Sequence, residues 1–334
     1  MFDERELQGI WYGRRQPGVV LRVLAGLFGV AGAMRRGFYA AGLLARVRLP
    51  VPVIVVGNIT VGGTGKTPLV IALVQALRAR GRKPGVIGRG YGGSVQGVAR
   101  VDAQSDPLVV GDEARLIFDA TGVPVAVGRD RVAAGRALLA SETVDLLIAD
   151  DGLQHHRLQR DIEICVIDGE RRFGNGRLLP AGPLREPVSR LDRVDFRVCN
   201  GGEAQPGEIP MTLAGEQAVA LDDGARSQPL RAFAGQRVHA VAGIGNPQRF
   251  FAQLRVAGID VIEHPFGDHH AYVAKDLDFG DGLPILMTEK DAVKCRAFAR
   301  PSLWYVLARG VLPETWLDSV FDRLSGAGRK RRPD

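Results

Sequence analysis

The chain has 334 residues, 46% of them hydrophobic and 24% charged, which suffices for one large or two ordinary globular domains and excludes a disordered chain. Its three cysteines, Cys165, Cys199 and Cys295, lack the close spacing of a zinc site or a disulfide framework, which favours a reducing compartment. The net charge is +7, and no acidic residue occurs between Glu6 and Asp102. This first third of the chain is therefore expected to attract anions.

Residues 1–50 are predicted to form a basic, apolar N-terminal segment. Its longest charge-free apolar run, 23–34, is shorter than the roughly 20 residues that a membrane-spanning helix needs. The run begins late and arginines interrupt the segment, so a secretion signal is not expected either. Two interpretations remain open: a helix lying on an anionic membrane surface, and a helix packed on the protein core. On a membrane, each nearby arginine would add about 1 kcal/mol of attraction.

From residue 51 the pattern is that of an alternating α/β protein. Short apolar runs bounded by glycine or proline predict strands at 51–58, 83–90, 123–128, 144–152, 161–168 and 193–200. Helical periodicity occurs between several of them, at 67–81, 111–122 and 129–142. Strands separated by helices imply a mostly parallel sheet with helices on both faces, which we assign to a core domain at 51–200.

The remainder of the chain is predicted to contain a second, smaller α/β domain. Residues 201–230 are rich in glycine, proline and polar groups and carry two weak strands, so we expect a linker or a β-hairpin there. Strand and helix patterns resume over 231–323 and define the smaller domain, which would close a cleft against the first. Residues 324–334 end in the sequence GRKRRPD and are expected to be a basic, disordered tail.

A candidate phosphate-binding loop occupies the sequence VGNITVGGTGKT, residues 56–67. It follows a predicted strand and opens a predicted helix, the context that a P-loop requires. Glycines let backbone N–H groups approach phosphates, a lysine can neutralise β- and γ-oxygens, and a threonine can bind Mg²⁺. The loop departs from the strict P-loop pattern at its start, where a threonine replaces the first glycine. The candidate ATP-binding residues are Thr60, Val61, Gly62, Gly63, Thr64, Gly65, Lys66 and Thr67.

Two adjacent carboxylates, Asp150 and Asp151, follow the apolar run at 144–149. P-loop proteins place an acidic residue at the end of a neighbouring strand, where it serves the Mg²⁺ shell. The pair is therefore predicted to bind magnesium together with Thr67. A solvated turn or a helix cap is the alternative interpretation.

Eight motifs in a fixed order resemble the tetraacyldisaccharide 4'-kinase family: VGNITVGGTGKTP, GRGYGG, GDEARL, DDGLQHHRL, RRFGNGRLLPAGPLREP, GIGNPQRFF, PFGDHHAY and TEKDAVK. The resemblance covers about residues 10–310. It implies a P-loop fold and the transfer of the γ-phosphoryl group of ATP·Mg²⁺ to the 4'-hydroxyl of an acylated glucosamine disaccharide 1-phosphate. That reaction belongs to lipid A biosynthesis and forms lipid IVA. The family also implies a peripheral protein at the cytoplasmic face of the inner membrane of Gram-negative bacteria.

The same resemblance implies roles for individual residues. Asp112 of GDE would be the base that takes the hydroxyl proton, and Lys66 would neutralise phosphate charge. His269 would orient or assist Asp112, although the choice between His269 and His270 stays open from one sequence. The residues implied to line the active site are Glu113, Arg129, Arg131, Gln154, Arg185 and Glu186.

Other interpretations of these residues remain open at this point. Asp112 and Glu113 could cap the helix that follows them, and Arg185 and Glu186 could form an exposed ion pair. A competing function is a switch- or partition-type P-loop ATPase that acts on a protein or DNA partner. Such proteins usually carry a lysine where this chain has Val61. No nucleic-acid module is recognisable, so neither a nucleic acid nor an obligate protein partner is expected.

Overall fold

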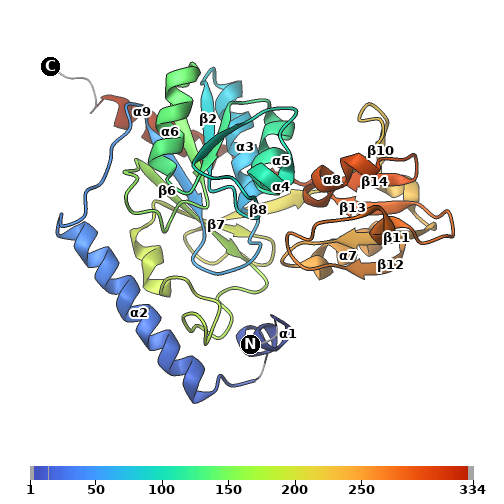
Figure 1. The fold of residues 1–334 in the computed structure, drawn as a ribbon, viewed down its shortest axis with the longest axis horizontal. Helices are drawn as coiled ribbons and strands as arrows, with labels where there is room; N and C mark the ends of the chain where they lie inside the picture. The colour runs from blue at the N-terminus through green and yellow to red at the C-terminus, as the bar shows by residue number, and fades with distance from the viewer. Residues whose placement is uncertain (1–3, 14, 330–334) are drawn as a thin grey trace.

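The structure, a computed structural model, describes residues 4–13 and 15–329 and contains two sheets, each the centre of one unit (Figure 1). The first sheet has nine strands in the order β15-β8-β7-β6-β1-β5-β2-β4-β3. Its inner seven strands are parallel, and β3 and β15 are antiparallel edges. The strands are β1 (Val53–Gly57), β2 (Pro84–Gly88), β3 (Val98–Val101), β4 (Val125–Gly128), β5 (Leu146–Asp150), β6 (Ile162–Asp168), β7 (Phe196–Asn200), β8 (Glu208–Ala214) and β15 (Arg309–Val311). The predicted α/β class with a mostly parallel sheet is confirmed.

Helices cover both faces of this sheet. Apolar residues of α3 (Lys66–Ala79), α5 (Asp112–Thr121) and α9 (Glu314–Arg329) are buried in one cluster with one face of the sheet. Those of α6 (Arg131–Ser141) are buried with the other face. A short helix, α4 (Pro107–Val110), precedes α5. The strands and helices expected over 51–200 are all found, whereas β3 was missed because only one of its four residues is buried and no apolar run marks it.

The second unit is built on six strands in the order β10-β9-β14-β13-β11-β12. The four strands from β14 to β12 are parallel, and β9 and β10 are antiparallel. The elements are β9 (Gln217–Ala220), β10 (Ser227–Pro229), β11 (Arg237–Ala242), α7 (Pro247–Val256), β12 (Asp260–Pro265), β13 (Ile285–Thr288), α8 (Glu289–Cys295) and β14 (Leu303–Val306). Short 3₁₀ helices occur at Val188–Arg193 in the first unit and at Leu230–Phe233, Ala274–Leu277 and Arg296–Phe298 in the second.

Strand pairing divides the chain differently from the boundaries expected above. β8 extends the first sheet, while β9 and β10 form a hairpin at one edge of the second sheet, so residues 201–230 contribute strands to both sheets. The chain then returns to the first unit, where β15 pairs with β8 and α9 buries Trp316, Val320 and Leu324. The apolar pattern shows that these segments are buried, but it carries no information on which sheet receives them. The expected tail at 324–334 begins inside α9, and residues 330–334 lie outside the described residues.

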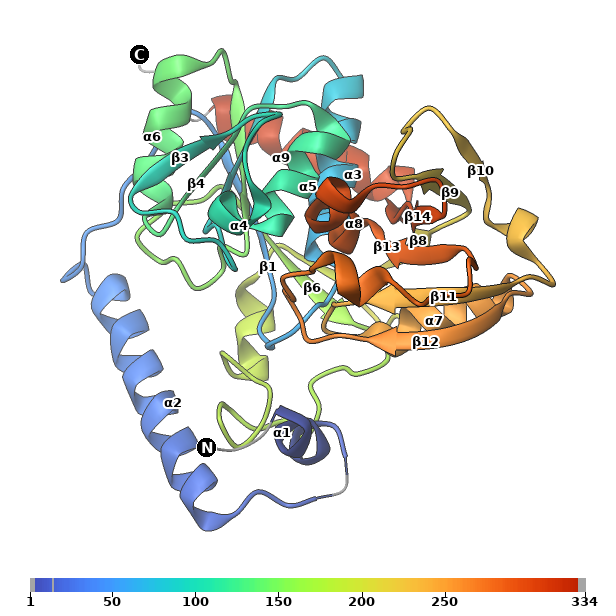
Figure 2. The ribbon, with the colours of Figure 1, turned by 45° about the vertical axis from the view of Figure 1, so that its right-hand side comes forward.

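The N-terminal helices α1 (Glu4–Trp11) and α2 (Val19–Ala40) lie outside the layers of the first unit in both ribbon views (Figures 1 and 2). Leu21 and Ala25 are the buried residues of α2, and they contact Ala181 and Leu178. Much of the remaining apolar surface of α2 is exposed, for example Leu27 at 63% and Val30 at 60%. Among the described residues, no helix has both the length and the apolar character to cross a membrane.

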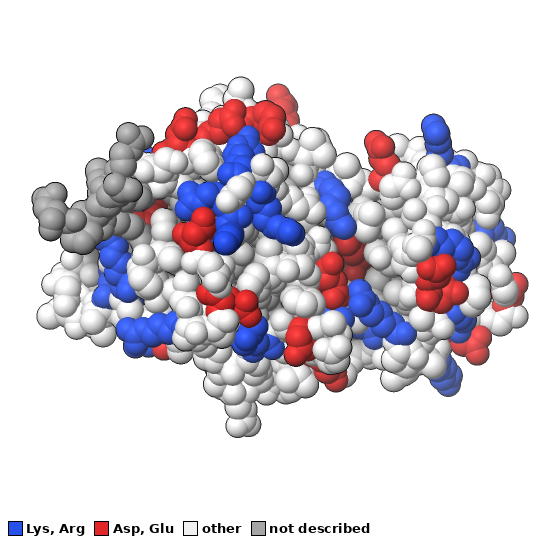
Figure 3. All heavy atoms as spheres, turned by 90° about the horizontal axis from the view of Figure 1, so that it is seen from above, with Lys and Arg blue, Asp and Glu red and all other residues white. Residues whose placement is uncertain are grey.

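The two units meet side by side. Seen from above, they join at an indentation of the surface where acidic and basic side chains lie close to one another (Figure 3). The carboxyl ends of the parallel strands β1, β5 and β7 carry Asn58, Asp150 and Asn200. Since ligands of open parallel sheets bind beyond the carboxyl ends of the strands, the fold directs attention to this junction.

Candidate active site

The loop between β1 and α3 has the backbone geometry of a phosphate cradle. Gly65 adopts φ +92° and Gly62 φ +97°, values that side chains rarely tolerate. A Cβ at Gly65 would also lie 2.2 Å from Nδ2 of Asn200, which donates a hydrogen bond to the carbonyl oxygen of Thr64 at 3.0 Å. Glycine is therefore required at position 65, and the N-terminal backbone of α3 is left open for an anion.

Lys66 is held beside a carboxylate. Its Nζ donates to Oδ1 of Asn58 at 3.3 Å and lies 3.6 Å from Oδ1 of Asp151. Arg185 donates to both oxygens of Asp151, at 2.9 and 3.1 Å. Burial by itself would raise the pKa of Asp151, but Lys66 and Arg185 outweigh burial and hold it well below its ordinary value. Two cations are thus positioned at the start of the phosphate loop.

Asp150 has the opposite environment. It ends β5, is 5% exposed, and its Oδ1 has no hydrogen-bond partner among the described residues. Burial first, and then repulsion from Glu113, raises the pKa of Asp150 to about 7. An unpartnered buried oxygen of this kind is costly, and a divalent cation would satisfy it. Thr67, in the first turn of α3 and 8% exposed, offers a hydroxyl that fits the same group.

Asp112 and His269 come from different units and meet. Asp112 opens α5 and is 3% exposed, while His269 follows β12. Nδ1 of His269 lies 3.0 Å from each carboxylate oxygen of Asp112. Burial opposes both ionised forms, but the hydrogen bond between the two groups, together with nearby charges, outweighs it: the pKa of Asp112 is lowered and the pKa of His269 is raised. His270 turns away instead and places Nε2 2.9 Å from Asp276.

Lys290 of α8 joins this pair to its surroundings. Its Nζ lies 3.3 Å from Oε1 of Glu113, 3.2 Å from Oδ1 of Asp268 and 3.9 Å from Oδ2 of Asp112. Burial alone would lower the pKa of Lys290, but these carboxylates raise it above its ordinary value. The side chain of Asp112 also accepts a hydrogen bond from the backbone N–H of Glu113 at 2.9 Å, so it contacts the first turn of α5 and His269 at the same time.

The segment 171–187 packs on the phosphate loop and brings several of the expected lining residues to the site. Its backbone pairs with the loop, since Arg185 N–H donates to Ile59 oxygen at 2.7 Å. Glu186 is 2% exposed and accepts from Gln154, which also donates to the carbonyl oxygen of Asn58. Because Arg185 bonds to Asp151 and Glu186 is buried, the alternative of an exposed Arg185–Glu186 ion pair is wrong.

The two remaining expected lining residues behave differently. Arg131 is buried and donates to the backbone carbonyl oxygen of Asp151 at 3.0 Å, so it holds the main chain that carries this carboxylate. Arg129 is exposed, and its side chain makes no hydrogen bond or ion pair within the described part of the chain. The structure therefore brings Arg131 to the site and leaves Arg129 outside these contacts.

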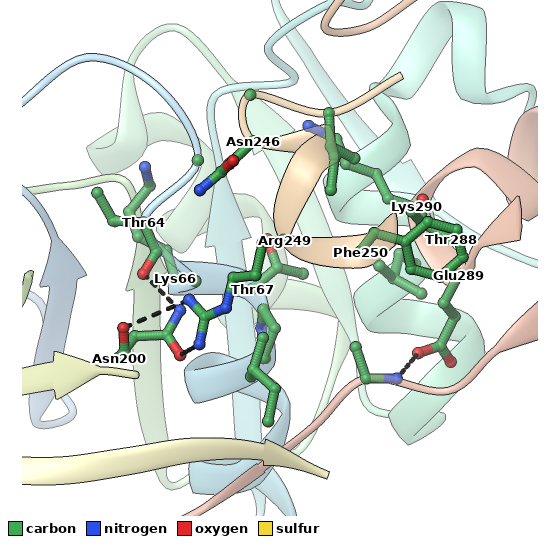
Figure 4. A pocket seen from close by; sticks show the side chains of 18 of the residues that line it. Thr64, Lys66, Thr67, Asn200, Asn246, Arg249, Phe250, Thr288, Glu289 and Lys290 are labelled. Carbon is green, nitrogen blue, oxygen red and sulfur yellow. Dashed lines mark hydrogen bonds between the residues drawn. The ribbon is translucent and has the colours of Figure 1, made fainter. Parts of the chain in front are cut away.

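A cavity of about 300 Å³ lies between the phosphate loop and the second unit. Figure 4 shows side chains from both units around it: Thr64, Lys66 and Thr67 on one side, Phe250 and Lys290 on the other. Its lining is apolar at Ile71, Leu116, Leu213, Ile244 and Val306. A flat apolar group attached to a phosphate chain would fit such a space.

Sequence reasoning gave no site role to Asn200 or Arg249, and it left Lys290 open between a structural role in the second domain and contact with the substrate; all three line this cavity. Arg249 of α7 donates to Oδ1 of Asn200 at 3.2 Å and so joins the second unit to the end of β7 (Figure 4). Asn200 had a usable signal, a polar residue directly after a buried strand. Arg249 had none, because helical charged residues are usually solvated.

Three comparisons place the chain among known proteins. A family model described as tetraacyldisaccharide-1-P 4'-kinase matches residues 18–325. A tetraacyldisaccharide 4'-kinase of Azoarcus sp. strain BH72 is 55% identical over 321 residues, covering 94% of each chain, and one of Xanthomonas euvesicatoria is 52% identical over 330 residues, covering 95% of each. A crystal structure of LpxK from Aquifex aeolicus in complex with ATP has a TM-score of 0.76 and 28% identity, covering 90% of this chain and 97% of that one. On this evidence, the chain belongs to the tetraacyldisaccharide 4'-kinase family.

Proposed function

We propose that this chain transfers the γ-phosphoryl group of ATP to the 4'-hydroxyl of a tetraacyldisaccharide 1-phosphate, the kinase step of lipid A biosynthesis that its family carries out. One observation supports the assignment above the others. Lys66 and Thr67 of the phosphate loop line the same cavity as Glu113 and Lys290, which are the immediate neighbours of the Asp112–His269 pair. A phosphate donor and a proton acceptor can therefore meet in one place.

The phosphate loop would hold the triphosphate of ATP. Backbone N–H groups from Gly63 to Thr67 face the anion, and Lys66 supplies positive charge near the transferred group. Mg²⁺ would be held by Thr67 and Asp150, whose unpartnered buried oxygen fits a cation. Asp151, expected from the sequence as a third ligand, is instead paired with Lys66 and Arg185, so we assign it the role of holding these two cations in place. Magnesium bound there would neutralise charge that develops on the phosphate oxygens. The apolar part of the cavity would receive the adenine ring.

Asp112 would take the proton of the sugar hydroxyl. The bond between that oxygen and the γ-phosphorus forms while the bond to the β-phosphate oxygen breaks, giving ADP and a phosphate monoester, and the hydroxyl proton passes to a carboxylate oxygen of Asp112. His269 keeps that carboxylate oriented and ionised by donating from Nδ1. Lys290 and Lys294, 3.9 and 3.8 Å from Asp112, add positive charge that also stabilises its ionised form.

The helix α2 would contact the membrane in which the acyl chains of the substrate are held. Its exposed apolar side chains and the absence of acidic residues between Glu6 and Asp102 suit an anionic bilayer surface. The alternative of a helix buried on the protein core fits poorly, because only Leu21 and Ala25 are buried in it. The protein would thus act as a peripheral enzyme on the cytoplasmic face of the inner membrane.

The decisive test is mass spectrometry of the lipid acceptor after incubation with ATP and Mg²⁺. The parent should add one phosphate at the 4' position, and Lys66→Ala and Asp112→Asn should each reduce kcat/KM by about 10²–10⁴. Lys83→Ala, which changes an exposed lysine outside the site, is the matched control and should leave the rate unchanged. Unaltered rates in both site variants would contradict the proposal.

A DNA arm of the same assay addresses the competing function. A switch- or partition-type ATPase would hydrolyse ATP with DNA or a protein present and leave the lipid acceptor unmodified. The family match argues against that function, since kinases of the family are its relatives at more than 50% identity.

A further inference from the structure

A second cavity, of about 390 Å³, lies where the C-terminal end of α2 meets the first unit. It shares no lining residue with the cavity at the phosphate loop. Five of its lining residues are arginines, contributed by the end of α2, the turn after it and the segment 160–193. They are Arg36, Arg46, Arg160, Arg190 and Arg193. Such a density of guanidinium groups around one concave space is characteristic of phosphate recognition.

The acidic residues around the cavity are already engaged. Glu163 accepts from Arg160 at 2.8 Å and from Arg190 at 2.7 Å, so one carboxylate faces two guanidinium groups. Asp195 pairs with Arg323 and Asp161 with Arg48, neither of which lines the cavity. Glu186, outside the lining, lies 3.5 Å from Nε of Arg190 and 3.9 Å from a terminal nitrogen of Arg36. The five lining arginines therefore face three lining carboxylates and this fourth one, which leaves a small excess of positive charge.

Two further observations mark the cavity as incomplete without an anion. Arg190 is 9% exposed, and its NH1 has no hydrogen-bond partner among the described residues. Arg46 and Arg193 are exposed and form no ion pair within the described part of the chain. A buried guanidinium nitrogen without an acceptor destabilises the fold by the desolvation of that group. A phosphate oxygen would supply the missing acceptor.

The surroundings of the cavity indicate where that phosphate comes from. Ala40, the last residue of α2, lines it, and the adjacent side chains Phe38, Leu43 and Leu44 are exposed at 44%, 72% and 39%. Exposed apolar side chains next to arginines are the arrangement that sits at the boundary between lipid headgroups and acyl chains. A site for free phosphate needs no such apolar rim.

We propose that this cavity binds the phosphate group of an anionic membrane phospholipid and so fixes the C-terminal end of α2 at the headgroup level. The inference deepens the membrane contact of α2 and does not depend on the kinase reaction. Membrane binding would then have two contributions: apolar side chains of α2 enter the bilayer, and the arginine cavity favours lipids with a negatively charged headgroup.

The test is vesicle flotation of the full chain with the double variant Arg46→Gln/Arg193→Gln, which changes only exposed arginines. The matched control is Arg231→Gln/Lys275→Gln, which removes the same charge from exposed residues of the second unit. On phosphatidylcholine vesicles containing phosphatidylglycerol, the cavity variant should bind about 25-fold more weakly than the parent, roughly fivefold for each cation removed. The control should bind as the parent does, and all three should bind pure phosphatidylcholine equally.

Each other outcome overturns part of the argument. Equal losses in both double variants would show that net charge, rather than the cavity, attracts the lipid. No loss in the cavity variant, or failure of the parent to bind anionic vesicles, would refute the site. Calorimetric titration with inorganic phosphate separates the two sources: tight binding that the cavity variant lacks would identify free phosphate as the occupant and refute the lipid. Kinase activity on detergent-dispersed acceptor should be unchanged in the cavity variant, so failure of the proposed function would be recognised separately.

Discussion

The contact between His269 and Asp112 gives a quantitative prediction. His269→Ala removes a hydrogen bond from Nδ1 that lies 3.0 Å from both oxygens of a carboxylate with 3% exposure. Hydrogen bonds to charged groups contribute about 1.5–3 kcal/mol. Since this bond lowers the pKa of Asp112, its loss should raise that pKa. Asp112 would then lose its charge at a higher pH.

The assay is the pH dependence of kcat/KM for lipid phosphorylation at saturating Mg²⁺, so that protonation of Asp150 does not set the acidic limb. The acidic limb of the profile should move to higher pH in His269→Ala, with a lower rate on the plateau because the carboxylate is less well oriented. His270→Ala is the matched control: its ring bonds to Asp276, so the limb should stay where the parent has it. An unshifted limb in His269→Ala, or an equal shift in His270→Ala, would refute the assignment of the histidine.

Three further predictions concern the metal, the loop and the membrane. Because the pKa of Asp150 is raised to about 7, protons should compete with Mg²⁺ for its carboxylate. In the parent, the Mg²⁺ concentration that gives half the maximal rate should therefore rise about tenfold for each pH unit below 7. In Asp150→Asn this pH dependence should disappear. Gly65→Ala should weaken ATP binding, measured by calorimetry, far more than Gly62→Ala, since only at Gly65 does a Cβ collide with Asn200. Leu27→Ser/Val30→Ser should reduce flotation with neutral vesicles without lowering the melting temperature, because both side chains are mostly exposed; unchanged flotation would count against the role of α2.

Local sequence was sufficient for the elements and for half of the site. The β-branched run before Gly57 and the glycines before Lys66 fix a strand, a turn and a helix by short-range geometry, so the phosphate loop was predictable at its residues. The same holds for Asp150, which follows a buried strand. The family resemblance then supplied Asp112 and His269, which no local pattern joins because 157 residues separate them.

Tertiary structure alone decided the rest. Which sheet receives β8, β15 and α9 depends on backbone pairing and packing between distant segments, about which an apolar pattern is silent. Tertiary structure also separates the roles of Asp150 and Asp151, although the two are adjacent in the sequence. Asp150 ends a strand and has an unpartnered oxygen, whereas Asp151 forms ion pairs with Lys66 and Arg185. The sequence identifies which residues are charged, but the fold determines which partner each charged side chain contacts and therefore what it can do.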